Sequence, residues 1–333
     1  MADAAPVDPR RVVGGPGPRV ALALGSGGAR GYAHIGVIDE LRERGYRIVG
    51  VAGSSMGALV GGLQAAGRLD DFAEWARALT QRAVLRLLDP SISAAGVLRA
   101  EKILDTVREI LGPVDIEELP IPYTAVATDL INGRSVWLQR GPVDEAIRAS
   151  IAIPGVIAPY VIDGRLLADG GILDPLPMAP IAAINADLAI AVSLNGSESG
   201  AEREADTSPA ADWLNRMVRS TSTLFEATTA RSRAVLNRFG AAGEPADAAG
   251  QADEADAPKL GGRFEVMNRT IDIAQAALAR HILAAYPPDV LIEVPRSACR
   301  SLEFHRAAEV IDIGRGLAAR ALDDLETVPA TDR

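Results

Sequence analysis

The sequence predicts an α/β fold in which a mainly parallel sheet is covered by helices on both faces. Residues 19–25 and 47–52 are short, nearly continuous apolar runs, as in strands that are buried on both sides. A helical pattern over residues 30–44 joins them into a βαβ unit, which requires parallel strands. With 333 residues, 48% of them hydrophobic, the chain can bury a core of that kind.

The remaining elements continue this alternation. Helices are expected at residues 58–63, 69–88 and 100–111, and strands at 123–128, 135–138, 165–168 and 188–194. Helix 263–285, strand 290–294 and helix 303–324 are expected to complete the sheet. We therefore divide the chain into a disordered leader 1–18, a core 19–195, an acidic mobile insert 196–262, a C-terminal unit 263–325 and a tail 326–333. An arginine-bearing helix at about 213–239 in the insert fits a solvated helix packed on the domain better than one lying on a membrane.

Composition excludes several classes of function. The net charge of -10, from 34 basic and 44 acidic residues, argues against nucleic-acid binding. One cysteine, Cys299, and three histidines leave no disulfide framework and little basis for a metal site. Residues 1–10 lack the apolar core of a secretory signal, and the uncharged stretch 48–67 is interrupted by glycines. We expect a cytoplasmic protein that contacts membranes at most peripherally.

The pentad Gly53-Ser54-Ser55-Met56-Gly57 lies between a predicted strand and a predicted helix. This context turns a Gly-x-Ser-x-Gly pattern into a nucleophile elbow, a strained turn that projects a serine hydroxyl at the edge of a sheet. Only Ser55 has glycine two residues before it and two residues after it, whereas Ser54 does not. Ser55 is therefore the predicted nucleophile, with Gly53 and Gly57 shaping the elbow.

A glycine-rich loop, residues 25–31, connects the first strand to its helix. Its backbone N–H groups and the following helix can bind an anion. A dinucleotide site would need glycine in place of Arg30 and an acid at the end of the second strand, and a Walker loop would need Gly-Lys-Ser/Thr. Both patterns are absent. Beside a nucleophilic serine, the remaining function is an oxyanion hole with Gly27 and Gly28 as donors, although a plain tight turn would also explain the glycines.

The nucleophile also needs a base, and the best placed group is Asp169 in Asp169-Gly170-Gly171, directly after the predicted strand 165–168. Its carboxylate is a weak base, with an unperturbed pKa of about 3.9, so it would depend on a dry site and a strong oxyanion hole. On its own, an Asp-Gly-Gly sequence is also common as a turn near a helix cap. His34, His281 and His305 lie in helical segments and are poorer candidates, with His305 the alternative that stays open.

The three motifs, in this order, resemble the patatin-like phospholipases, which use a Ser-Asp dyad in a three-layer α/β/α sandwich. The resemblance is closest to the bacterial branch related to the catalytic domain of neuropathy target esterase, through residues 30–37, 125–130, 146–155 and 304–307. It implies Ser55 as nucleophile, Asp169 as general base, Gly27 and Gly28 as oxyanion donors, and loop support from Gly25, Arg30 and Gly31. Two departures are Ser26, where patatins usually have a third glycine, and Gly171, where alanine is more usual.

The resemblance further implies a serine hydrolase that acts on phospholipids, lysophospholipids or other acyl esters through an acyl-enzyme. It implies no metal, no cofactor and independence of calcium. The alternative is a lipid-binding or regulatory adaptor with little turnover. Head group, acyl chain, positional specificity and oligomeric state are not determined by these motifs.

Overall fold

The computed structural model describes residues 17–87, 101–154, 156–196 and 263–327. The predicted leader 1–18, the insert 196–262 with its helix at 213–239, and the tail 326–333 fall almost entirely outside the described residues. The chain divides into two compact units, residues 1–200 with 272–333 and residues 201–271. The second unit is described only at residues 263–271, so the fold and site below belong to the first.

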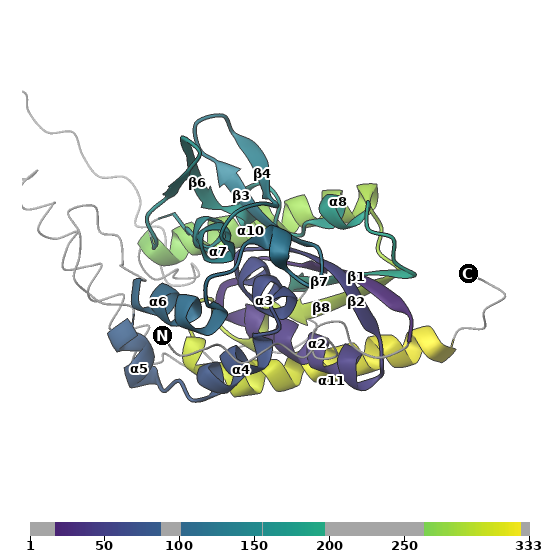
Figure 1. Ribbon diagram of the computed structural model, residues 1–333. Coiled ribbons are helices and arrows are strands. Elements are labelled where there is room, and N and C mark those ends of the chain that lie inside the picture. The colour runs from purple at the N-terminus through teal and green to yellow at the C-terminus, as the bar shows by residue number, and fades with distance from the viewer. Residues whose placement is uncertain (1–16, 88–100, 155, 197–262, 328–333) are drawn as a thin grey trace, which may run out of the picture. The chain divides into compact units, whose positions relative to one another are not determined.

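The described residues contain one eight-stranded sheet with the order β5-β6-β3-β2-β1-β7-β8, in which β4 pairs with the other edge of β3 (Figure 1). Strands β3, β2, β1, β7 and β8 are mutually parallel. Strands β4 and β6 pair antiparallel with β3, and β5 pairs antiparallel with β6. The predicted mainly parallel sheet is thus confirmed. The strands are β1 Arg19–Leu24, β2 Arg47–Ser54, β3 Tyr123–Asp129, β4 Arg134–Leu138, β5 Tyr160–Ile162, β6 Arg165–Asp169, β7 Leu188–Gly196 and β8 Val290–Pro295.

The helices agree with the predicted positions, with a few differences. Residues 69–88 hold two helices, because Thr80 Oγ1 accepts the N–H of Ala83 and starts a second one. The helix after the glycine loop begins with a 3-10 turn, η1. The helices are η1 Gly28–Tyr32, α2 Ala33–Glu43, α3 Met56–Ala65, α4 Leu69–Arg77, α5 Gln81–Leu87, α6 Glu101–Leu111, η2 Ile116–Glu118, α7 Val143–Ser150, η3 Gly170–Ile172, α8 Met178–Ile181, α10 Arg263–Ala285, η4 Arg296–Ala298, η5 Phe304–Arg306 and α11 Ala307–Thr327.

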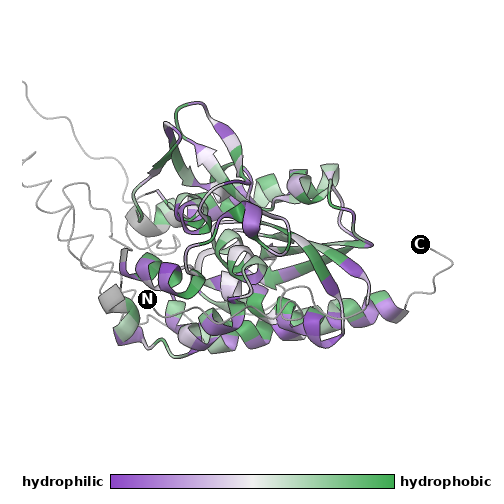
Figure 2. Ribbon diagram, viewed as in Figure 1, coloured by the Kyte–Doolittle hydropathy of each residue, from purple (hydrophilic) through white to green (hydrophobic). Residues whose placement is uncertain are grey.

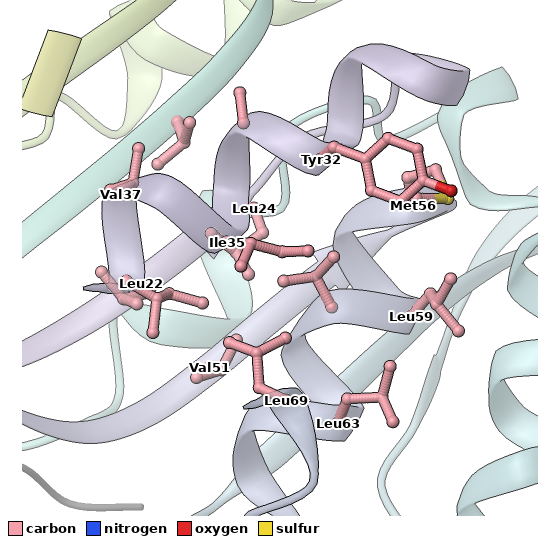
Figure 3. Packing of buried hydrophobic residues seen from close by; sticks show 14 of the residues in the cluster. Leu22, Leu24, Tyr32, Ile35, Val37, Val51, Met56, Leu59, Leu63 and Leu69 are labelled. Carbon is pink, nitrogen blue, oxygen red and sulfur yellow. The ribbon is translucent and has the colours of Figure 1, made fainter. Parts of the chain in front are cut away.

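Helices cover both faces of the sheet, and the alternation of side chains along each strand assigns every residue to one face or the other. In β1, Val20, Leu22 and Leu24 join the large cluster with α2, α3 and α11, part of which is shown in Figure 3. Ala21 and Ala23 point to the opposite face and pack with α8 and α10. Alternate residues of a strand face opposite sides of a sheet. The large side chains of β1 therefore pack against helices on one face and its alanines against helices on the other, which gives a three-layer arrangement. Among the described residues, no helix is both long and apolar enough to span a bilayer.

Candidate active site

Ser55 lies in a strained turn between β2 and α3. Its φ of 56° and ψ of -121° make it one of two non-glycine residues with positive φ in the described part of the chain. Its carbonyl accepts the N–H groups of Ala58 and Leu59, at 2.9 and 3.1 Å, and so begins the helix. Strain of this kind persists only where the surrounding structure enforces it, and it is characteristic of a nucleophile elbow.

The two flanking glycines allow the chain to turn this sharply. A Cβ on Gly53 would collide with the carbonyl of Gly57, and one on Gly57 would collide with the carbonyl of Leu24 at the end of β1. Any larger residue would therefore push α3 away from the strands. The pattern that singled out Ser55 in the sequence has a steric origin.

Strand β3 brings Ser55 and Asp169 together. Its first half pairs with β2, where Ser54 lies opposite Val126. Its second half pairs on the same edge with β6, where Asp169 lies opposite Ala127, because β4 occupies the other edge. Strands β2 and β6 thus meet end to end at consecutive residues of β3. Asp169 ends a strand of the sheet, as expected, and this strand, β6, is antiparallel to β3.

The two side chains form a hydrogen-bonded dyad. Ser55 Oγ donates to Asp169 Oδ2 at 2.5 Å, and Asp169 Oδ1 accepts the N–H of Gly171 at 2.7 Å. Ser55 is only 2% exposed and Asp169 only 4%. Burial disfavours the carboxylate and raises the pKa of Asp169 to about 6, although both hydrogen bonds oppose this shift. Asp169 also caps η3, so the turn expected for Asp-Gly-Gly and the contact to Ser55 occur together.

Two further polar residues hold the dyad in position, and sequence reasoning gave neither a role. Ser150, the last residue of α7, donates from Oγ to the carbonyl of Val126 at 2.6 Å and accepts the N–H of Ser55 at 2.9 Å. Thr128 Oγ1 donates to the carbonyl of Asp169 at 3.0 Å. These contacts link the backbone of Ser55 and Asp169 to β3. A serine that ends a helix and a threonine within a strand have no local pattern that predicts such contacts.

Two backbone N–H groups of the glycine loop have no acceptor among the residues that the structure describes. The N–H groups of Gly25, Ser26 and Ala29 donate to the carbonyls of Val192, Pro175 and Ser301. Within the described residues, those of Gly27 and Gly28 have no such partner, although both glycines are buried. Since buried N–H groups are almost always paired, two adjacent free donors are a feature expected of an anion site.

Arg30 supports this loop through an ion pair that is distant in sequence. Its guanidinium Nη2 lies 3.1 Å from Asp272 Oδ1 on α10, with the two side chains 4% and 19% exposed. The carbonyl of Asp272 in turn accepts a hydrogen bond from Arg296. The pair ties η1 to α10 across 242 positions of sequence. That separation explains why sequence reasoning did not identify Asp272.

Ser26 and Gly171, the two departures from the usual patatin pattern, lie against each other. A Cβ on Gly171 would collide with Ser26 Oγ and would lie 2.6 Å from the side-chain amide of Gln275. The extra volume at position 26 is therefore matched by the missing volume at position 171.

We expect Gly171→Ala to reduce stability and the double variant Ser26→Gly/Gly171→Ala to recover part of the loss, because the close contact with the Gln275 amide remains. Overpacking a buried site costs about 1–3 kcal/mol, and removing the Ser26 side chain makes room for the added methyl group. Urea unfolding of both single variants, the double variant and the wild type measures the coupling. Additive effects of the two substitutions would show that the compensation does not exist.

The three histidines and Asp174 make no hydrogen bond to Ser55 or Asp169 among the described residues. His34 is buried, its Nε2 donates to the carbonyl of Gly25 at 2.9 Å, and burial lowers its pKa to about 4. His281 and His305 have no described hydrogen bond to Ser55 or Asp169. Burial also raises the pKa of Asp174 to about 6, and its buried Oδ1 has no partner among the described residues. No group of three or more His, Cys, Asp or Glu in the described residues could hold a metal ion.

Comparison with known proteins identifies the family of the chain. The family model described as patatin-like phospholipase matches residues 22–182, which include the glycine loop, the elbow and Asp169. A Mycobacterium tuberculosis protein named as an uncharacterized NTE family protein is 69% identical, over 96% of this chain and 97% of its own. The chain belongs to the NTE family of patatin-like proteins.

More distant relatives share part of this NTE family chain. Neuropathy target esterase sws of Drosophila melanogaster is 31% identical over 55% of this chain and 13% of its own length. Among solved structures, VipD from Legionella pneumophila matches with a TM-score of 0.41 and 15% identity, over 92% of this chain and 67% of that chain. The patatin fold of the family is the one described above, a mainly parallel sheet flanked by helices.

Proposed function

We propose that this NTE family protein hydrolyses acyl esters of phospholipids or lysophospholipids through an acyl-enzyme on Ser55. The observation that carries the proposal is the hydrogen bond from Ser55 Oγ to Asp169 Oδ2 at the apex of the elbow. A hydroxyl next to a buried carboxylate on a strained turn is the arrangement needed for nucleophilic attack on an ester. The family names support a lipid ester as the substrate.

In the first half of the reaction, Asp169 takes the proton of Ser55 as Oγ attacks the ester carbonyl. The N–H groups of Gly27 and Gly28 stabilise the oxyanion of the tetrahedral intermediate. Asp169 then returns the proton to the departing alcohol, which leaves an acyl group on Ser55. In the second half, Asp169 removes a proton from water, which attacks the acyl group, and then returns that proton to Ser55 Oγ as the fatty acid is released. The steps need no metal or cofactor, because carboxylate and backbone donors supply the proton transfers and the charge stabilisation.

The proposed substrate, a membrane lipid, determines where in the cell the reaction would take place. We propose a cytoplasmic enzyme that meets its lipid at the membrane surface. Its single cysteine is consistent with a reducing compartment.

The direct test is hydrolysis of a lipid panel by the wild type beside Ser55→Ala. The panel varies head group, acyl length and the number of acyl chains, and released fatty acid is measured. We expect at least one phospholipid or lysophospholipid to be cleaved by the wild type and none by Ser55→Ala. If a fluorophosphonate probe labels Ser55 but no lipid or soluble ester is hydrolysed, the protein is an adaptor.

The pH profile tests the base. Because Asp169 must be ionised to accept a proton and burial raises its pKa to about 6, we expect kcat/KM to be level above about pH 7 and to fall about tenfold per unit below pH 6. The matched control is Asp174→Asn, which removes another carboxyl with a pKa of about 6. The acid limb should persist in this control. Its disappearance would assign the limb to Asp174.

A further inference from the structure

His34 is a buried titratable residue that takes no part in the proposed proton transfers. It lies at the start of α2, on a face of the sheet whose helices carry bands of hydrophobic and hydrophilic residues (Figure 2). Its side chain is fully buried, and Nε2 lies 2.9 Å from the carbonyl oxygen of Gly25. A carbonyl oxygen only accepts, so Nε2 carries the proton. Burial lowers the pKa of His34 to about 4, so the ring is neutral at physiological pH and has this one N–H.

The other ring nitrogen indicates which property of His34 matters. Nδ1 is buried and has no hydrogen-bond partner among the described residues. In the neutral ring Nδ1 is an acceptor, and a buried acceptor without a partner reduces stability. An apolar side chain would avoid this cost. The property that distinguishes histidine from an apolar residue at this position is therefore the N–H that it donates to Gly25.

Gly25 is the point at which the glycine loop leaves β1. Its N–H donates to the carbonyl of Val192 on β7 at 3.0 Å, and its carbonyl accepts the N–H of His34. Both polar groups of this residue are thus held. Gly27 and Gly28, whose N–H groups find no acceptor in the described part of the chain, follow closely. His34 therefore holds the backbone from which the proposed oxyanion donors extend.

The same carbonyl oxygen lies close to the nucleophile elbow. A Cβ on Gly57, in the first turn of α3, would lie 2.9 Å from the carbonyl oxygen of Gly25. This oxygen is thus next to both the ring of His34 and the helix that follows Ser55. Oxyanion donors must lie about 2.7–3.1 Å from the developing charge, so a rotation of this peptide would misplace them relative to Ser55 Oγ.

The helix that carries His34 is held rigidly. A Cβ on Gly36 would collide with the carbonyl of Ile311 on α11, and a Cβ on Gly314 would collide with the carbonyl of Ala33. The backbones of α2 and α11 are therefore in direct contact just before and just after His34 in the sequence. A side chain on such a platform can keep a loop in one position.

We propose that His34 is a positioning residue, which fixes the Gly25 carbonyl and thereby sets the glycine loop against the nucleophile elbow. It acts through the loop and transfers no proton. The inference rests on the proposed function, because the loop stabilises an oxyanion only if the site hydrolyses esters. Loss of the hydrogen bond should weaken binding of the tetrahedral transition state and leave binding of the substrate unchanged.

Three variants of His34 separate the donor from the side chain that carries it. In His34→Gln, the amide nitrogen stands as many bonds from Cβ as histidine Nε2 does, so it can still donate to Gly25. His34→Asn has the same amide on a shorter chain, and His34→Leu has no donor. For a soluble ester, we expect kcat to fall about 10- to 100-fold in the asparagine and leucine variants, with KM within about twofold of the wild type. The glutamine variant should retain kcat within about threefold.

Two further measurements distinguish positioning from a general loss of structure. A trifluoromethyl ketone adds to Ser55 and forms an oxyanion, so its inhibition constant should rise across the variants as kcat/KM falls. Hydrogen exchange of the peptide containing residues 25–31, measured by mass spectrometry, should be faster in the asparagine and leucine variants than in the wild type and the glutamine variant.

Two results would overturn the positioning role. One is wild-type kcat and wild-type exchange in His34→Leu. The other is a loss of kcat that follows the unfolding temperature in all three variants, with the glutamine variant as impaired as the others. If the wild type hydrolyses no ester, the proposed function fails, and the exchange measurement still decides whether His34 holds the loop.

Discussion

Ser55→Ala is expected to lower kcat for ester hydrolysis by roughly 10⁴- to 10⁶-fold, as removal of a nucleophile does in other serine hydrolases. The substitution removes the oxygen that forms the acyl-enzyme, and the positive φ of Ser55 leaves the turn strained with either side chain. Steady-state hydrolysis of a soluble ester measures the loss. Circular dichroism and thermal unfolding verify that the variant is folded.

Ser54→Ala provides the matched control, one residue away and with the same loss of a hydroxyl. Ser54 Oγ is buried and has no hydrogen-bond partner among the described residues, so its removal should leave kcat within a few-fold of the wild type. Loss of activity in Ser54→Ala with activity retained in Ser55→Ala would show that the elbow was assigned to the wrong serine.

Asp169→Asn is expected to lower kcat by roughly 10²- to 10⁴-fold, the usual contribution of a general base. The amide has the size of the carboxyl and can still accept the N–H of Gly171, but it cannot take a proton from Ser55. The fold should therefore persist while turnover is lost. If the variant hydrolyses esters at close to the wild-type rate, the base is another group, and His305→Ala is the next variant to measure.

The Asp169→Asn substitution should also change how the free energy of unfolding depends on pH. Burial raises the pKa of Asp169 from 3.8 to about 6, so the folded state holds a proton that the unfolded state releases. The associated stabilisation is complete below pH 3.8 and is lost as pH rises through 6, so ionised Asp169 costs the fold on the order of 3 kcal/mol at pH 8. Asparagine carries no charge. The free energy of unfolding of Asp169→Asn, relative to the wild type, should increase from pH 4 to pH 8.

Much of the site was predictable because its chemistry depends on local patterns. The glycines around Ser55 and in residues 25–31 are required by close backbone approach, and such requirements are visible as motifs. The parallel strands were visible as continuous apolar runs. Elements of three or four residues, such as β5 and α8, are too short to show a period, and α7 was not identified either.

What could not be predicted depends on pairing between distant segments. The meeting of Ser55 and Asp169 depends on β6 running antiparallel beside β3, and no residue of β6 specifies that direction. Ser150 and Asp272 contact the site through register and through an ion pair to a helix far along the chain. Tertiary contacts of this kind follow from the assembled sheet and its covering helices.

Whether Ser55 is the nucleophile and Asp169 its activating base can be decided by labelling with a fluorophosphonate probe, followed by proteolysis and mass spectrometry. We expect one labelled peptide, modified at Ser55, with no labelling in Ser55→Ala and much slower labelling in Asp169→Asn. Labelling that is undiminished in Ser55→Ala, or that proceeds at the wild-type rate in Asp169→Asn, would contradict the dyad.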